Sequence, residues 1–188
     1  MKITSADQKV DWSQEIQGDV EFAPNFGIVQ VPLIWCTGSI TAGMGTHIKA
    51  GTSIDAGTYI NAGGYIKAGT YINAGGYINA GTSIDADGYI NAGTSIDADG
   101  YITAGNYGIT AGFYITCKET LSAKMRIIAG VFPTLDGTDP SCSHITCGKL
   151  LSGTVVGELV ETGLPDAKPC TPETIVVDGV TYRREDSR

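Results

Sequence analysis

Tyrosine and aspartate are the side chains whose spacing in this chain favours binding at a surface. Tyrosines recur at multiples of six residues, and aspartates gather toward the C-terminal end of the same stretch. Tyrosine combines a large contact area with a polar tip, and carboxylates attract the lysines and arginines of a partner. The predicted binding site, expected to come together on one outward face, comprises Tyr89, Tyr101, Asp85, Asp87, Asp97 and Asp99. Stacked tyrosines also stabilise neighbouring strands, and the sequence leaves this alternative open.

Catalytic and metal-binding patterns are weak. One group of residues near the C-terminus has the thiolate and imidazole side chains that zinc prefers: Cys142, His144, Cys147 and Cys170. They lack a CxxC knuckle, and isolated cysteines are commonly buried, so zinc binding stays an open question. The chain has no phosphate-binding loop with lysine, no carboxylate dyad and no nucleophile elbow. The sequence therefore predicts a protein that is not an enzyme and has no cofactor.

The elements that position these side chains follow from one period. Isoleucine recurs every six residues from Ile48 to Ile102 without a slip. Six is not a multiple of 3.6, so these isoleucines would spiral around a helix; six is a multiple of two, so in an extended chain they all point the same way. A short fixed period is typical of a solenoid, in which each coil packs on its neighbours. We therefore predict an all-β chain that forms a single parallel β-solenoid.

The same alternation assigns the rest of each hexad to two faces. Ala56, Thr58 and Ile60 are expected to face a dry interior. Tyr59 and Asn61 are expected to face water. The Ala-Gly and Ala-Asp pairs are predicted to form the corners, because Gly accepts a positive φ and Asp tolerates it better than most residues.

The hexads resemble the hexapeptide pattern of left-handed parallel β-helices: an aliphatic residue, a small or acidic one, two free positions, a small residue and one free position. Ile54-Asp55-Ala56-Gly57-Thr58-Tyr59 fits this pattern, and the resemblance covers residues 38–115. It implies triangular coils of three hexads. Many proteins of this family are acyltransferases with a histidine base, for which this chain offers only His47 and His144. The long loop that builds the acyl-donor site is missing, so this activity is the least favoured.

A second period of twelve residues lies on the first. The segment 80–91 returns at 92–103 with only the last residue changed. Either a tandem duplication left this period, or each coil holds twelve residues in two faces. Two facing rows of isoleucine need sheets about 10 Å apart, which the short corners of a two-faced coil would have to span. We favour the triangular coil of 18 residues and leave its handedness open.

Three segments divide the chain. Residues 1–36 carry no period and hold both tryptophans, Trp12 and Trp35, so they are predicted to form an N-terminal cap. Residues 37–117 are the hexapeptide-repeat β-solenoid, and residues 118–188 are predicted to form a C-terminal cap.

Two further elements are predicted within the C-terminal segment. Ile145, Leu151 and Val156 return at near-hexad spacing and indicate an extra coil. Two β-rich runs around Asp178-Gly179 predict a terminal β-hairpin.

Composition limits the partners. The net charge of −8 is spread evenly: five acids and two bases in residues 1–36, five and two in 37–117, and ten and eight in 118–188 give −3, −3 and −2. The solenoid has no basic patch, which disfavours direct nucleic-acid binding. No apolar run reaches the length of a membrane span and residues 1–9 are no signal peptide, so we expect no membrane contact and a location in the host cytoplasm. The oligomeric state, a homo-oligomer included, stays open.

The near-perfect repeat, the short caps and the C-terminal Val-Asp-Gly-Val-Thr-Tyr-Arg segment resemble small proteins of bacteriophages and other mobile elements. Small phage proteins of this kind are often inhibitors of host defence, and some acidic β-solenoids are similar to nucleic acid in shape and charge. The leading hypothesis is a non-enzymatic, anti-CRISPR-like inhibitor that binds a host protein, a nucleic-acid-handling defence enzyme, through an acidic, Tyr-rich face. The alternative is a structural component of a phage virion or appendage.

Overall fold

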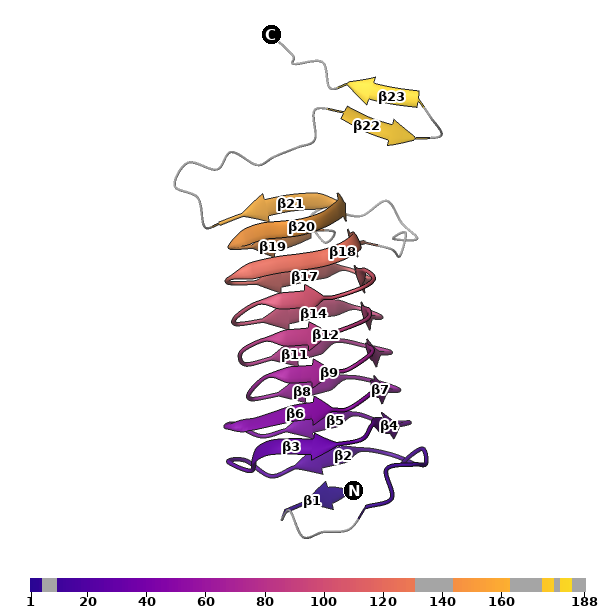
Figure 1. The fold of residues 1–188 in the computed structure, drawn as a ribbon, viewed down its shortest axis with the longest axis vertical. Coiled ribbons are helices and arrows are strands. Elements are labelled where there is room, and N and C mark those ends of the chain that lie inside the picture. Colours follow the sequence, from indigo (N-terminus) through magenta and orange to yellow (C-terminus); the bar gives the residue numbers. More distant parts are fainter. Residues whose placement is uncertain (5–9, 131–143, 163–173, 178–179, 184–188) are drawn as a thin grey trace.

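The described residues form a parallel β-solenoid. The computed structural model describes residues 1–4, 10–130, 144–162, 174–177 and 180–183. These residues form strands and turns only, and the strands stack into about six coils along one axis (Figure 1). The predicted all-β solenoid is confirmed. Within the same residues no helix is long and apolar enough to cross a membrane.

The strands stack into three faces. The first face contains β1 (Lys2–Ile3), β2 (Val20–Phe22), β5 (Ile40–Ala42), β8 (Ile60–Ala62), β11 (Ile78–Ala80), β14 (Ser95–Ala98), β17 (Tyr114–Cys117), β19 (His144–Cys147) and β21 (Glu158–Glu161). The second contains β3 (Gly27–Val31), β6 (Thr46–Ala50), β9 (Ile66–Ala68), β12 (Ile84–Ala86) and β15 (Ile102–Ala104). The third contains β4 (Ile34–Cys36), β7 (Ile54–Ala56), β10 (Ile72–Ala74), β13 (Ile90–Ala92) and β16 (Ile109–Ala111). The long strand β18 (Thr120–Ala129) turns a corner and joins the second face to the third, and β20 (Lys149–Val156) pairs along it.

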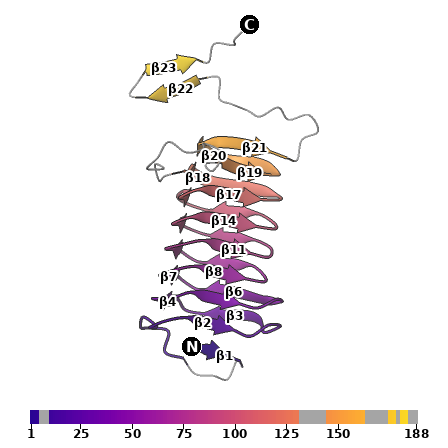
Figure 2. The same cartoon turned by 180° about the vertical axis from the view of Figure 1, so that it is seen from behind.

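The regular coil contains 18 residues. Ile72 pairs in parallel with Ile54 on one side and with Ile90 on the other, which are three hexads away in each direction. The same register recurs on the other two faces, and the back of the stack in Figure 2 shows the same even spacing of coils. The triangular coil is therefore confirmed, and the twelve-residue period of the sequence does not correspond to a coil.

Isoleucine and alanine fill the interior. The isoleucines of the repeat from Ile48 to Ile102 are 0% exposed, and each stacks on an aliphatic residue of the adjacent coils. The alanines two residues further on, such as Ala56 and Ala74, are buried beside them. Full burial of a side chain of this size stabilises a fold by about 1.5–3 kcal/mol relative to exposure. The inward assignment of isoleucine and alanine is confirmed.

The inward assignment of threonine was wrong. Thr58, Thr70 and Thr82 are exposed, and Thr94 is half-buried. The reason is that most repeat strands contain only three residues and end at the alanine, so the alternation of inward and outward positions ends there too. The threonines lie at the corners, where the carbonyl of Thr70 accepts a hydrogen bond of 2.5 Å from the backbone N–H of Gly88 in the next coil.

Glycine forms the corners for a reason other than the predicted one. Between residues 57 and 105 none of the described glycines has a positive φ. A Cβ on Gly75 would clash with the carbonyl oxygen of Gly57 in the preceding coil, and one on Gly93 with that of Gly75. Close approach of stacked backbones therefore excludes a side chain. Asp87 and Asp99 follow Ala86 and Ala98 at corresponding corners, so these two corners accommodate a Cβ.

Parallel pairing extends to both sides of residues 37–117. Before them, β2, β3 and β4 pair with β5, β6 and β7. After them, β19 and β21 extend the first face and β20 follows β18. Ile145 is buried as the predicted extra coil requires, but Leu151 and Val156 are exposed. Leu150 and Val155, which pair with the buried Leu121 and Ile127 of β18, pack against the core instead.

Aromatic rings gather at the N-terminal end. Trp12 stacks on Phe22 with 6.1 Å between ring centroids, and Phe22 meets Phe26 edge-on at 6.5 Å. Trp35 points outward from β4 and is 47% exposed. At the other end of the chain, β22 (Thr174–Val177) and β23 (Val180–Arg183) pair antiparallel, which confirms the two strands of the predicted hairpin; residues 178 and 179 lie outside the described residues.

Candidate binding surfaces of the solenoid

The structure distributes the six predicted site residues over all three faces. Asp85 and Tyr101 lie on the second face, at β12 and just before β15. Asp97 lies on the first face in β14, and Tyr89 precedes β13 of the third face. Asp87 and Asp99 are exposed at corners. Because consecutive hexads belong to consecutive faces, the six residues do not form one site. Asp85 and Tyr101 come together at one hollow in the surface, and Asp97 and Asp99 lie close to each other at the end of β14.

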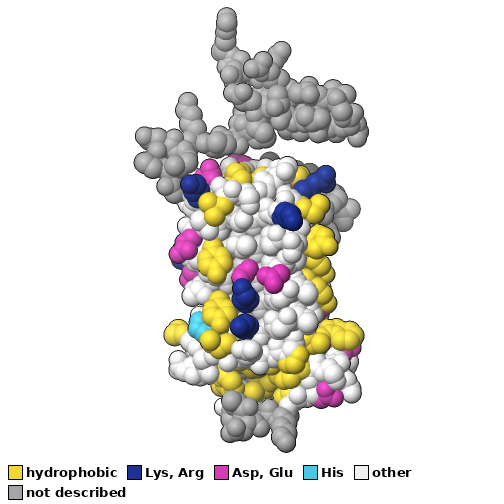
Figure 3. Space-filling model, viewed as in Figure 1, with side chains coloured by type: hydrophobic (Ala, Val, Ile, Leu, Met, Phe, Trp, Pro, Cys, Tyr) yellow, Lys and Arg dark blue, Asp and Glu magenta, His cyan; other side chains and the backbone are white. Residues whose placement is uncertain are grey.

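Asp85 forms an ion pair with Lys67. The two are the outward residues of β12 and β9, and the Lys67 Nζ–Asp85 Oδ2 distance is 2.5 Å. The hydrogen bond to Asp85 raises the pKa of Lys67 above its ordinary value. Charges on this side of the described residues lie in small mixed groups among uncharged side chains (Figure 3). Asp85 therefore offers a partner one member of a neutralised pair, not an isolated negative charge.

Asp97 and Asp99 lie near a lysine of the next coil. Lys118 Nζ is 2.6 Å from Asp99 Oδ1, and this hydrogen bond raises the pKa of Lys118. Burial raises the pKa of Asp97, and the charge of Asp99 adds to the effect. Asp97 is half-buried because it is the outward residue of β14, paired in register with Asn79 and Thr116 of the adjacent coils.

Amide side chains form a ladder on the third face. Asn73 Nδ2 donates to Asp55 Oδ1 at 3.1 Å, and Asn91 Nδ2 donates to Asn73 Oδ1 at 2.9 Å. The three residues are the outward positions of β7, β10 and β13 and stack in register. These hydrogen bonds link the side chains of three successive coils on the third face.

Tyrosines stack from coil to coil at the corners. The rings of Tyr59 and Tyr77 lie 4.8 Å apart with an interplanar angle of 5°, and those of Tyr71 and Tyr89 lie 5.0 Å apart at 1°. Burial, and then the neighbouring ring, raises the pKa of Tyr77 and of Tyr89. These four tyrosines therefore fit the alternative that the sequence left open, in which stacked rings stabilise adjacent coils.

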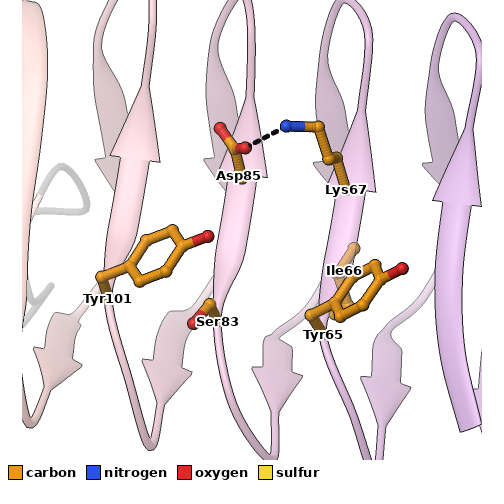
Figure 4. Close-up of a pocket in the computed structure, with 6 residues that line it drawn as sticks. All are labelled: Tyr65, Ile66, Lys67, Ser83, Asp85 and Tyr101. Carbon is orange, nitrogen blue, oxygen red and sulfur yellow. Dashed lines mark hydrogen bonds and ion pairs between the residues drawn. The ribbon is translucent and has the colours of Figure 1, made fainter.

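One hollow of about 220 Å³ interrupts this pattern on the second face. It is lined by Tyr65, Ile66, Lys67, Ser83, Asp85 and Tyr101. Ser83 lies between the two tyrosines, and the Lys67–Asp85 pair borders the same hollow (Figure 4). Sequence reasoning missed Tyr65, Lys67 and Ser83. The signal was present, because serine replaces tyrosine before some isoleucines, but it is informative only once the 18-residue register is known.

Histidine and cysteine are placed apart from one another. The His47 ring stacks on Tyr65 at 4.3 Å, and its Nδ1 accepts a hydrogen bond of 2.9 Å from the Tyr65 backbone N–H. His144 stacks on Tyr114 at 5.6 Å on the outward side of the first face.

The potential zinc ligands do not gather within the described residues. Cys147 is buried inside the solenoid and so lies on the side of β19 opposite to His144. Cys142 and Cys170 lie outside the described residues. Over the described ranges no three residues of the His, Cys, Asp or Glu type gather as a metal site would require.

Comparison with protein families, with curated proteins and with solved structures gives no match for this chain.

Proposed function

We propose that this chain is a non-enzymatic binding protein that engages a protein partner through the second face of its solenoid. The observation that carries the proposal is the contrast between interior and surface. Isoleucine and alanine fill the interior of the repeat, whereas charged and aromatic side chains lie in outward columns fixed by the coil register. Fixed aromatic and polar groups on a rigid surface lose little entropy on binding, which favours recognition of a macromolecule.

The charge of the chain favours a partner with basic residues. The net charge is −8, and Asp87 and Asp99 project from exposed corners on either side of the second face. Such carboxylates steer association with lysines and arginines and disfavour direct contact with nucleic acid. A nucleic-acid-handling enzyme presents these basic residues. The biological setting we propose is therefore a bacteriophage inhibitor of a host defence enzyme of this class, acting in the host cytoplasm.

The rod-like stack of coils favours a second candidate, a structural part of a virion or appendage. Long, rigid solenoids separate or join other components by their length. Under this alternative the partners are virion proteins, and the outward columns serve assembly.

Affinity capture from a lysate of phage-infected cells tests both candidates. One variant removes the four carboxylates of the predicted site: Asp85→Asn, Asp87→Asn, Asp97→Asn and Asp99→Asn. A matched control removes the same number of charges from positions outside residues 37–117: Asp11→Asn, Glu15→Gln, Glu21→Gln and Glu158→Gln. We expect the parent and the control to retain one host enzyme at low salt, and the site variant to bind it about tenfold or more weakly.

Two outcomes would overturn the inhibitor proposal. Retention of virion proteins in place of a host enzyme would favour the structural role. Equal binding by the site variant and the control would show that the acidic corners of the solenoid do not form the contact.

A further inference from the structure

The tyrosine columns show what fits between two coils. Where tyrosines occupy successive coils, one ring occupies each coil, as in the pairs Tyr59–Tyr77 and Tyr71–Tyr89, which are separated by 4.8 and 5.0 Å. The rings are nearly parallel, at 5° and 1°. One coil of this solenoid therefore provides room for one aromatic ring in each column.

At Ser83 this ring is missing. Tyr65 belongs to the preceding coil and Tyr101 to the following one, because Ile66, Ile84 and Ile102 pair in register. Tyr65 and Tyr101 are therefore two strand spacings apart, which is about 9.6 Å. Figure 4 shows the two rings on either side of Ser83, with both hydroxyls pointing toward the N-terminal coils. We call the gap between Tyr65 and Tyr101 over Ser83 the Ser83 slot.

We propose that the Ser83 slot binds one planar aromatic ring, supplied by a tyrosine, phenylalanine or tryptophan side chain of a protein partner. The inference rests on the proposed function and names the contact that the partner makes. A ring placed midway lies about 4.8 Å from each tyrosine, within the range of centroid distances that aromatic pairs favour.

The walls and the rim of the slot suit such a ring. Tyr65 is held from behind by His47, which stacks on it at 4.3 Å and accepts its backbone N–H. The wall is therefore supported before a ligand arrives. Ser83 and the Lys67–Asp85 pair at the rim supply a hydroxyl, an ammonium and a carboxylate group. These groups can bond the hydroxyl of a tyrosine or the indole N–H of a tryptophan.

Charge favours a protein side chain over a nucleobase. A nucleotide brings a phosphate that needs unpaired cations, but Lys67 is paired with Asp85, and the chain carries −8 overall. A single ring between two tyrosines binds weakly by itself, since it has few atoms. A protein partner supplies the remaining contacts from its own surface, and the ring then provides a desolvated anchor.

Fluorine NMR detects binding in the Ser83 slot directly. The protein is labelled with 3-fluorotyrosine, and the ¹⁹F signals of Tyr65 and Tyr101 are assigned by Tyr65→Phe and Tyr101→Phe. The probe is N-acetyl-tyrosinamide. N-acetyl-leucinamide is the control without a ring, and adenosine monophosphate is the nucleotide that tests binding of a nucleobase. Ser83→Tyr fills the slot with the protein's own ring. Ser53→Tyr is the matched control, because it adds a ring next to Tyr71, on the third face.

We expect the tyrosinamide to shift both signals saturably, with a dissociation constant on the order of millimolar. The shift should persist in Ser53→Tyr and disappear in Ser83→Tyr, which should melt no lower than the parent. The proposal is overturned by a non-saturable response, by an equal response to leucinamide, by a shift that persists in Ser83→Tyr, or by tighter binding of adenosine monophosphate.

Capture of the partner separates this inference from the proposed function. If Ser83→Tyr weakens capture by about tenfold and Ser53→Tyr does not, the partner uses the slot. If the probe binds but Ser83→Tyr captures the partner as well as the parent does, the inference fails and the proposed function stands. If the parent captures no protein, the proposed function fails, and the partner-borne ring fails with it.

Discussion

A single inward carboxylate should unfold the solenoid, whereas the same charge on the outside should not. Ile78 is 0% exposed and stacks between Ile60 and Ile96 in the middle of the first face. We expect Ile78→Asp to abolish cooperative folding. Asn61→Asp places the same charge on the exposed outward position of β8, one coil earlier. This matched control should change the free energy of unfolding by less than about 0.5 kcal/mol.

The magnitude follows from burial and stacking. Ile78→Val should cost about 1 kcal/mol and Ile78→Ala about 2–5 kcal/mol, because the interior column cannot close over the missing methyl groups. Ile78→Asp adds the penalty of an unpaired buried charge, several kcal/mol more. The sum is comparable with the whole stability of a typical domain, about 5–15 kcal/mol.

Urea unfolding followed by far-ultraviolet circular dichroism measures the series. The expected order of midpoints is parent and Asn61→Asp, then Ile78→Val, then Ile78→Ala, with no cooperative transition for Ile78→Asp. In a stack of coils that contact only their neighbours, the alanine variant should also broaden the transition. A soluble Ile78→Asp protein with the midpoint of the parent would refute the inward packing of the isoleucines.

Three further predictions follow from the same structure. Gly93→Ala should lower the urea midpoint more than Gly51→Ala. A Cβ on Gly93 would clash with a backbone carbonyl oxygen of the preceding coil, whereas the nearest atom to a Cβ on Gly51 is 3.3 Å away. Equal effects of the two substitutions would contradict the close approach of the coils. Burial, and then a neighbouring aspartate, raises the pKa of Asp97 above its ordinary 3.8, so stability is greatest while Asp97 is protonated and falls as the pH rises through the raised value. Asp97→Asn should therefore raise the midpoint at pH 7 and leave it unchanged below about pH 3, and a lower midpoint at pH 7 would be inconsistent with this sign. Burial raises the pKa of Cys117 to about 12, and Cys36 and Cys147 are also buried. In a variant that carries Cys142→Ser and Cys170→Ser, Ellman's reagent should therefore react with these three thiols only after denaturation. Fast reaction of the folded variant would place the thiols at the surface.

The sequence by itself determined the strands and the contents of the core. Alternation along a strand is local, so isoleucine every six residues identifies the inward side without knowledge of any other strand. The hairpin strands before and after residues 178 and 179 were predictable for the same reason, because Asp-Gly between two β-rich runs is a local sequence signal. The threonines were misassigned where this local rule ends, at corners that follow strands of only three residues.

Only the tertiary structure decided which side chains meet. The sequence repeats every twelve residues, but the coil closes after 18, so the neighbour of a residue across coils belongs to a different half of the repeat unit. The closure depends on how three rows of isoleucine and alanine pack in one interior, which no short segment specifies. That mismatch pairs Lys67 with Asp85, separates Asp97 from Asp85 onto different faces, and places Ser83 between two tyrosines.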